Sequence, residues 1–273
     1  METTSTKQVT VTTTTKDSRK ASAHKEWIMR IKVTDGFAWG TVLKDIIVPA
    51  GLKQKFATGL QFFDSALGGQ GFTPSAVTLF TGEPGAGKTT MSMAIADSLS
   101  RAGQMVVFNT AEESLLQVKM SAERLRLTGS FRVGSEVHVP TLLKKCDSVR
   151  AIAPNKPFFL IVDSLQCMDD GHYPDGNTNS KSAERALTLM TDWAKTNYTC
   201  PVVIGQVTKG GTFAGSNSLK HIIDTHLHLS VEKKDEDLLG CRVLETQKNR
   251  FGPSGMRQIM TVTESGFKLI AQV

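Results

Sequence analysis

Cysteine is scarce in this 273-residue chain, and its four copies are far apart in the sequence. They stand at Cys146, Cys167, Cys200 and Cys241, and none forms a C-x-x-C pair. This spacing argues against a zinc knuckle and gives no support to a disulfide framework. We therefore expect a protein of the reducing cytoplasm.

Long apolar runs are missing as well. No stretch reaches the ~18 apolar residues that a membrane-spanning helix needs, and no signal-peptide pattern opens the chain. We expect neither membrane insertion nor secretion, and no membrane partner. The hydrophobic content of 40% is ordinary and sufficient for a sizeable core, and the net charge of +6 permits nucleic-acid binding without demonstrating it.

The chain divides by composition into three parts. Residues 1–22 are mostly Thr, Ser and Lys and lack bulky apolar side chains, which predicts a disordered tail. Residues 23–56 hold two tryptophans and several aliphatic residues but are too few for an independent domain. We interpret them as a linker or docking segment. Residues 57–273 form the remaining domain.

One motif organises that domain, and it fits G-x-x-x-x-G-K-[ST], the phosphate-binding loop. With the threonine that follows it, the candidate nucleotide-binding residues are Gly82, Glu83, Pro84, Gly85, Ala86, Gly87, Lys88, Thr89 and Thr90. An apolar run at 76–81 precedes the motif and predicts a buried strand, and helical spacing follows it over 90–101.

The expected strand and helix place the loop at a helix N-terminus. Unpaired backbone N–H groups and the positive end of the helix dipole favour phosphate there. The motif predicts that Lys88 reaches the β- and γ-phosphates and that the Thr89 hydroxyl coordinates Mg²⁺. ATP and Mg²⁺ are therefore the expected ligands.

Strands and helices alternate through the domain and predict an α/β fold, a mainly parallel sheet flanked by helices. Beyond 76–81, strands are expected at 105–109, 136–139, 157–162 and 201–205, and beyond 90–101, helices at 113–127, 141–152 and 181–197. Three successive strands at 225–231, 242–247 and 258–262 predict an antiparallel extension at the C-terminal edge of the sheet.

Polar residues at the ends of the predicted strands complete the nucleotide site. Asp163 closes an apolar strand, the pattern of a carboxylate that holds Mg²⁺. Glu112 and Glu113 follow another strand, either as the acidic first turn of a helix or as a group that activates water. We favour the second interpretation, with Glu112 the first choice and Glu113 the second. Gln206 ends a further strand and is a candidate sensor of the γ-phosphate.

Two further motifs point to a family. Gln206 begins Q-V-T-K-G-G-T-F-A-G, and Lys248 begins K-N-R-F-G. Together with E-E-S-L-L-Q-V-K from Glu112, they resemble the bacterial RadA/Sms family of RecA-like recombination ATPases over about residues 57–270.

The resemblance implies a RecA-like ATPase core that forms a homo-oligomer, a hexameric ring with ATP between subunits as in DnaB-type helicases. Lys248 and Arg250 would then reach the neighbour's γ-phosphate, where cations stabilise the charge of the transition state. The alternative is two solvated cations at a hairpin end. Recombinase or replication proteins are further partners that the resemblance leaves open.

Two departures from the family stand out. RadA proteins carry an N-terminal four-cysteine zinc motif, and residues 1–55 hold no cysteine. They also carry a C-terminal Lon-protease-like domain, for which this chain stops too soon. The expectation is a relative reduced to the ATPase core, of a kind that a phage could encode.

Single-stranded DNA is the expected macromolecular partner, held by two loops that should face the channel of the ring. Flexible, Gly-rich, lightly basic loops can follow a single-strand backbone. The candidate DNA-binding residues are Lys209, Gly210, Gly211, Phe213, Lys220 and Lys181. Either Phe213 or Tyr173 could stack on a base, or could pack within its own loop.

The resulting expectation is a DNA-stimulated ATPase that moves on single-stranded DNA in recombination, branch migration or repair, with possible helicase activity. Two alternatives remain open. One is an annealing accessory protein that uses ATP only to switch its grip on DNA and does not unwind. The other is a KaiC-like ATPase acting through protein contacts, with which the adjacent Glu112 and Glu113 are compatible.

Overall fold

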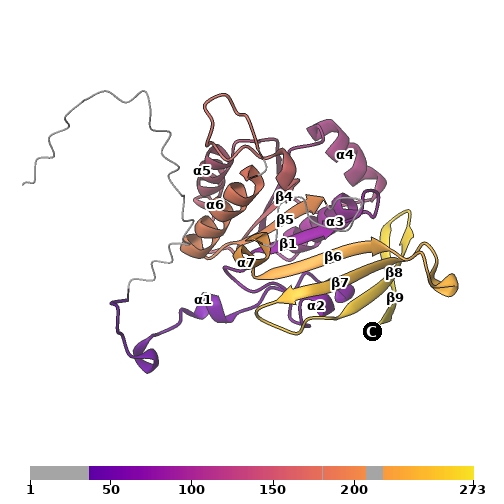
Figure 1. The fold of residues 1–273 in the computed structure, drawn as a ribbon, viewed down its shortest axis with the longest axis horizontal. Coiled ribbons are helices and arrows are strands. Elements are labelled where there is room, and N and C mark those ends of the chain that lie inside the picture. Colours follow the sequence, from indigo (N-terminus) through magenta and orange to yellow (C-terminus); the bar gives the residue numbers. More distant parts are fainter. Residues whose placement is uncertain (1–36, 180, 207–217) are drawn as a thin grey trace, which may run out of the picture. The chain divides into compact units, whose positions relative to one another are not determined.

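The computed structural model describes residues 37–179, 181–206 and 218–273, which form a mixed sheet covered by helices on both faces (Figure 1). The tail predicted at 1–22 lies outside the described residues. Along the sheet, the strand order is β3-β2-β4-β5-β1-β6-β7-β8-β9. Strands β3 to β6 in this order run parallel, and β6 to β9 are joined by antiparallel pairing.

The strands are β1 (Thr78–Gly82), β2 (Met105–Thr110), β3 (Arg132–Gly134), β4 (Phe158–Asp163), β5 (Cys200–Gln206), β6 (Thr225–Val231), β7 (Arg242–Asn249), β8 (Arg257–Thr263) and β9 (Gly266–Gln272). The α-helices are α1 (Ala50–Lys53), α2 (Gln61–Ala66), α3 (Lys88–Arg101), α4 (Leu115–Arg124), α5 (Val139–Arg150), α6 (Ser182–Asn197) and α7 (Ser218–Ile222). Short 3-10 turns occur at Leu43–Asp45, Leu165–Cys167 and Glu236–Leu238. None of the helices in the described ranges is long and apolar enough to cross a bilayer.

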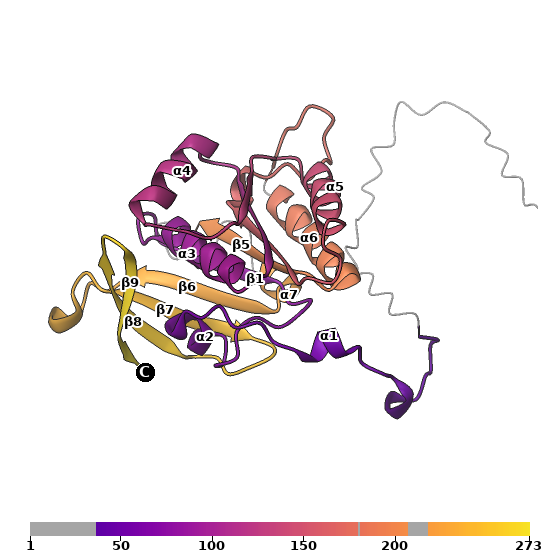
Figure 2. The same ribbon diagram turned by 180° about the vertical axis from the view of Figure 1, so that it is seen from behind.

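Helices lie on both faces of the sheet (Figure 2). Two clusters of apolar side chains pack between the helices and the sheet. Alternate residues of each strand point to opposite faces, so Phe80 of β1 packs with the cluster that includes α2 and α3, whereas Leu79 packs with the cluster that includes α5, α6 and α7. Strands β1, β2 and β4 are buried along their whole length. Burial on both faces explains why these parallel strands have continuous apolar sequences.

Segment 37–56 contrasts with this core. The turn Leu43–Asp45 and helix α1 contain no buried residue, and Trp39 is fully exposed. The first buried side chain is Phe56, whose backbone pairs with that of Phe72. A docking role for this segment stays a prediction, as do the domain boundaries.

The structure corrects one predicted strand and adds another. Residues 136–139 are not a strand, because the side chain of Asn109 binds both the N–H and the carbonyl of Glu136, and α5 already begins at Val139. The edge strand is instead β3, only three residues long. At the other edge, β9 was not predicted. Its alternating exposed side chains give a weak apolar signal.

The structure also corrects the place of β6 in the predicted sheet extension. Strand β6 was predicted within the antiparallel part, yet it pairs parallel with β1 on one side and antiparallel with β7 on the other. The antiparallel extension itself is confirmed, and it begins at β7. Helix α4 also begins later than predicted, at Leu115, because Ser114 caps its N-terminus in a reciprocal capping box with Gln117.

A polar cluster is buried between β1 and β6. The Thr81 hydroxyl lies 2.8 Å from Nε2 of His226 and 2.9 Å from Nδ1 of His228. Burial is the main cause that lowers the pKa of both histidines, that of His226 to about 4, and the nearby charges of His228, Lys220 and Lys248 lower it further. The folded protein therefore holds His226 in its neutral form at neutral pH.

This burial predicts acid sensitivity. Above the unfolded pKa of 6.5, burial of the neutral His226 does not reduce the free energy of unfolding. As pH falls from 6.5 towards 4, the unfolded chain binds a proton that the folded protein does not, so stability is lost. The difference between these two values corresponds to about 3 kcal/mol. Urea unfolding at pH 7 to 4 should show a smaller loss of stability in His226→Gln than in the unmodified chain. Parallel pH dependences in the two proteins would contradict this account.

Candidate nucleotide-binding site

The phosphate-binding loop connects β1 to α3, as predicted. Gly87 stands at the N-cap of α3 with a φ of 102°, in the left-handed region that favours glycine. A Cβ atom at this position would also lie 2.8 Å from the ring of Phe267 on β9. Gly82 is equally constrained, since its Cβ would meet the carbonyl oxygen of Leu229 at 2.3 Å. Both glycines are thus needed for the close approach of loop and sheet.

Lys88 is held by the loop itself. Its Nζ donates to the carbonyls of Gly82 and Glu83, both at 3.0 Å, and the side chain is buried. Burial lowers the pKa of Lys88, and the carboxylates of Asp163 and Glu112 partly oppose that effect. An ammonium group bound only to carbonyl dipoles is well placed to exchange one of them for a phosphate oxygen.

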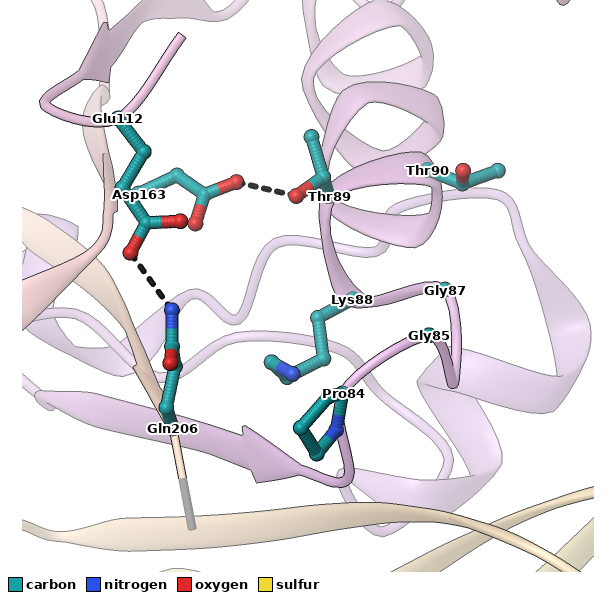
Figure 3. Close-up of a pocket in the computed structure, with 9 residues that line it drawn as sticks. All are labelled: Pro84, Gly85, Gly87, Lys88, Thr89, Thr90, Glu112, Asp163 and Gln206. Carbon is teal, nitrogen blue, oxygen red and sulfur yellow. Dashed lines mark hydrogen bonds between the residues drawn. The ribbon is translucent and has the colours of Figure 1, made fainter. Parts of the chain in front are cut away.

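The predicted magnesium ligands meet at the end of β4. The Thr89 hydroxyl donates to Oδ2 of Asp163 at 2.5 Å (Figure 3). Burial raises the pKa of Asp163 to about 6, and the charges of Glu112 and Glu113 raise it further, whereas the Thr89 hydrogen bond and Lys88 lower it. A carboxylate and a hydroxyl are the hard oxygen ligands that Mg²⁺ takes in nucleotide sites, together with phosphate oxygens. These residues fit the predicted metal.

Glu112 lies at the centre of a hydrogen-bond network. Its Oε1 accepts from Nε2 of Gln206 at 2.7 Å and from the hydroxyl of Ser164, and Sγ of Cys167 approaches to 3.6 Å. Gln206 is therefore in direct contact with the candidate base. Sequence reasoning missed Ser164 and Cys167. The position of Ser164 directly after Asp163 was the one available signal.

The two adjacent glutamates differ in where they point. Glu112 lines the cavity, whereas Glu113 does not. The Thr110 side chain binds the backbone N–H and carbonyl of Glu113. The Oε2 atom of Glu113 is buried without a hydrogen-bond partner among the described residues. This geometry favours Glu112 over Glu113 as the group that contacts a bound nucleotide.

A cavity of about 420 Å³ joins these groups, within the usual size of ligand pockets. Figure 3 shows Lys88, Asp163 and Gln206 around one space. The residues that line it are Pro84, Gly85, Gly87, Lys88, Thr89, Thr90, Glu112, Asp163 and Gln206. All nine were predicted as nucleotide, metal or catalytic residues.

Lys248 and Arg250 lie elsewhere. Asn249 pairs with Thr225, and Thr225 pairs with Thr78, at the opposite end of β1 from the loop that follows Gly82. The length of β1 separates the two ends by roughly 13 Å. The structure therefore does not bring these cations to the nucleotide cavity of their own chain.

The candidate DNA-binding residues are only partly described. Lys209, Gly210, Gly211 and Phe213 lie outside the described residues. Lys220 in α7 and Lys181 next to α6 are both exposed. The side chains of the loop that precedes α6 bind one another.

From α6, the guanidinium of Arg185 contacts the buried carboxylate of Asp170 in that loop and lies 5.9 Å from the centre of the Tyr173 ring. The Tyr173 hydroxyl also accepts from Asn179 at 2.7 Å. Of the two alternatives for Tyr173, the structure shows packing within its own loop.

Comparisons with known proteins show what this chain is similar to. The family model "ATPase: KaiC" matches residues 56–128. The chain is 33% identical to the DNA repair protein RadA of Mycobacterium tuberculosis over 199 residues, 71% of this chain and 39% of that protein. It is 32% identical to RadA of Haemophilus influenzae over 78% of this chain and 44% of that protein. It is 30% identical to RadA of Aquifex aeolicus over 80% of this chain and 47% of that protein.

The chain thus spans less than half the length of these curated relatives. Among solved structures, the "ATPase Domain of G40P" superposes with a TM-score of 0.70, covering 81% of this chain and 93% of that domain at 13% identity. This second likeness shows the fold.

The site predicts a separation of binding from hydrolysis. Lys88→Ala should abolish ATP binding, because it removes the cation that meets the phosphates. Glu112→Gln should retain ATP binding but lower the hydrolysis rate by about 10²–10⁴-fold, the usual contribution of a general base. Glu113→Gln is the matched control, with a turnover close to that of the unmodified chain. Equal losses in the two glutamate variants would contradict the assignment of Glu112.

Proposed function

Since this chain has a RecA-like ATPase fold and matches RadA proteins over more than two thirds of its length, we propose that it hydrolyses ATP between subunits of a homo-oligomer to move on single-stranded DNA. The role would be in recombination, branch migration or repair, in the cytoplasm. The proposal rests on the nucleotide cavity, on the RadA relatives and above all on the cations at the far end of the sheet.

In the proposed reaction, the loop N–H groups and Lys88 bind the β- and γ-phosphates of ATP. Thr89 and Asp163 would hold Mg²⁺, which would neutralise charge on the phosphates when bound. Glu112 orients a water molecule and accepts its proton. Gln206, now bonded to Glu112 at 2.7 Å, releases the carboxylate when its amide turns to the γ-phosphate.

The observation that carries the subunit-interface proposal is an excess of positive charge. Lys195, Lys248 and Arg250 surround one buried carboxylate, Asp224. One carboxylate does not neutralise three cations, so the cluster favours a further anion. The nucleotide cavity of the same chain lies at the other end of β1. The γ-phosphate of an adjacent subunit is the anion that fits a ring or filament.

This arrangement predicts loss of turnover without loss of binding. Lys248→Ala and Arg250→Ala should each lower kcat by about 10³-fold or more, as for other cations supplied in trans. ATP binding by each subunit should persist. Arg257→Ala, an exposed arginine on the neighbouring β8, is the control and should hydrolyse ATP normally.

A mixing experiment separates action in trans from a local effect. Lys88→Ala subunits cannot bind ATP but keep the finger cations, our term for Lys248 and Arg250, which would act on the neighbouring subunit's nucleotide. Arg250→Ala subunits bind ATP but lack the Arg250 finger. Mixed together, they should regain part of the activity that each lacks alone. An inactive mixture, despite measured co-assembly, would overturn the subunit-interface proposal.

DNA binding generates a separate prediction. Lys209→Ala combined with Lys220→Ala should weaken single-stranded DNA binding while leaving ATP hydrolysis without DNA intact. If both lysines contact phosphates, the logarithmic salt dependence of binding should become less steep by roughly 1.4. The measurement is DNA affinity at several salt concentrations, together with the ATPase rate with and without DNA. Unchanged affinity at low salt would refute the assignment of these lysines.

The KaiC family match over 56–128 favours one second candidate, an ATPase whose output is contact with another protein. Turnover that does not respond to single-stranded DNA, on a sample whose mass with ATP shows an oligomer, would favour that candidate. Strand displacement on forked DNA separates the proposed motor from an annealing protein that uses ATP only to change its grip.

A further inference from the structure

Asp224 is a fully buried carboxylate at the junction of α7 and β6. Its Oδ2 accepts from the backbone N–H of Val77 at 3.1 Å, and its own N–H donates to the carbonyl of Val77 at 3.0 Å. These bonds attach the junction to the start of β1 and leave Oδ1 for other partners. The position of Asp224 is therefore set by the sheet and not by the cations near it.

Two cations share the remaining oxygen. Nη1 of Arg250 lies 2.7 Å from Oδ1, and Nζ of Lys195, on α6, lies 3.6 Å from the same atom. The Arg250 side chain is 48% exposed, whereas that of Lys195 is only 17% exposed. Arg250 thus reaches Asp224 from the protein surface, and Lys195 reaches it from within the fold.

Lys195 lowers the free-energy cost of moving the Arg250 side chain away from Asp224. A buried carboxylate left without a counter-ion is strongly destabilising, so Asp224 alone would hold Arg250 tightly in place. With Lys195 beside it, the carboxylate keeps a partner when the guanidinium leaves. The backbone of Arg250 remains attached, because its N–H donates to the carbonyl of Asp224 at 2.9 Å. Only the side chain has to move.

We propose that Asp224 and Lys195 form a docking site for the Arg250 side chain, in which Lys195 replaces Arg250 as counter-ion when Arg250 contacts the neighbouring subunit's nucleotide. Both are positioning residues, and the inference rests on the proposed action of Arg250 in trans. The site holds the finger in a defined place before assembly and lowers the cost of releasing it.

Lys248 marks the contrast. Its Nζ donates to two backbone carbonyls, those of Lys220 at 2.6 Å and Ile223 at 2.7 Å. Neutral carbonyl dipoles hold it at the end of α7, and no second cation is needed to replace it there. The exchange therefore concerns Arg250 alone.

The first test measures turnover. Lys195→Met should lower kcat of the assembled protein at least about tenfold, because Asp224 then retains Arg250. ATP affinity should be unchanged. Adding Asp224→Asn to Lys195→Met should restore much of the rate. The asparagine carbonyl can still accept from Val77, while its amide no longer attracts Arg250. Lys145→Met, which removes an exposed lysine of α5, is the matched control with normal kcat.

The second test measures thermal stability without ATP, and so does not depend on activity in trans. Arg250→Ala should lower Tm by several degrees more in the Lys195→Met background than in the unmodified chain, because only the double variant removes both cations that contact Oδ1 of Asp224. Additive Tm changes would overturn the counter-ion exchange, whatever the kinetics show.

The two proposals fail differently. Normal turnover in Arg250→Ala would remove the trans finger, and with it the proposed purpose of the docking site, even if the Tm changes are not additive. Loss of turnover in Arg250→Ala with normal kcat in Lys195→Met would leave the finger in place and refute the docking site.

Discussion

The parallel pairing of β1 with β5 and β6 is the constraint on which the other features of this protein depend. It places the carboxyl ends of β1, β2, β4 and β5 at one edge of the sheet, where Lys88, Glu112, Asp163 and Gln206 surround a single cavity. Because β7 returns antiparallel to β6, the same sheet carries the K-N-R-F-G segment to the opposite edge. One sheet therefore presents a phosphate site at one end and the cations Lys248 and Arg250 at the other.

The charged groups at the two ends of the sheet have different surroundings. At the nucleotide end, Asp163 and Glu112 lie near Lys88, and Glu113 adds its charge near Asp163, which favours a cation such as Mg²⁺. At the other end, three cations lie near one carboxylate, which favours an anion. In our proposal, neighbouring subunits would bring these two unbalanced clusters together around one bound nucleotide. Each subunit alone would then hold two incomplete sites.

Contacts at both ends involve residues next to the loop that is expected to bind DNA. Gln206, at the end of β5, contacts Glu112, and the carbonyls of Lys220 and Ile223, in and just after α7, hold Lys248. Four of the residues expected to bind DNA, Lys209, Gly210, Gly211 and Phe213, lie between these two contacts in the sequence. In the proposed mechanism, DNA held by one subunit could thus affect two nucleotide sites, its own through Gln206 and the neighbour's through the finger cations.

Local sequence was sufficient where neighbouring residues carry the signal. The phosphate loop, the continuous apolar strands and the carboxylate at the end of β4 could all be predicted, because glycine spacing and burial on both faces leave direct marks in the sequence. Strands with weak sequence signals, the three-residue β3 and the alternating β9, were missed. Residues 136–139 were wrongly predicted as a strand. In the structure, the side chain of Asn109, distant in the sequence, binds Glu136 instead. Only the tertiary structure joined Glu112 to Gln206 and Ser164, or placed Lys195 beside Asp224 and Arg250. These contacts link residues far apart in the chain, and their geometry depends on strand order and register, which no local pattern encodes.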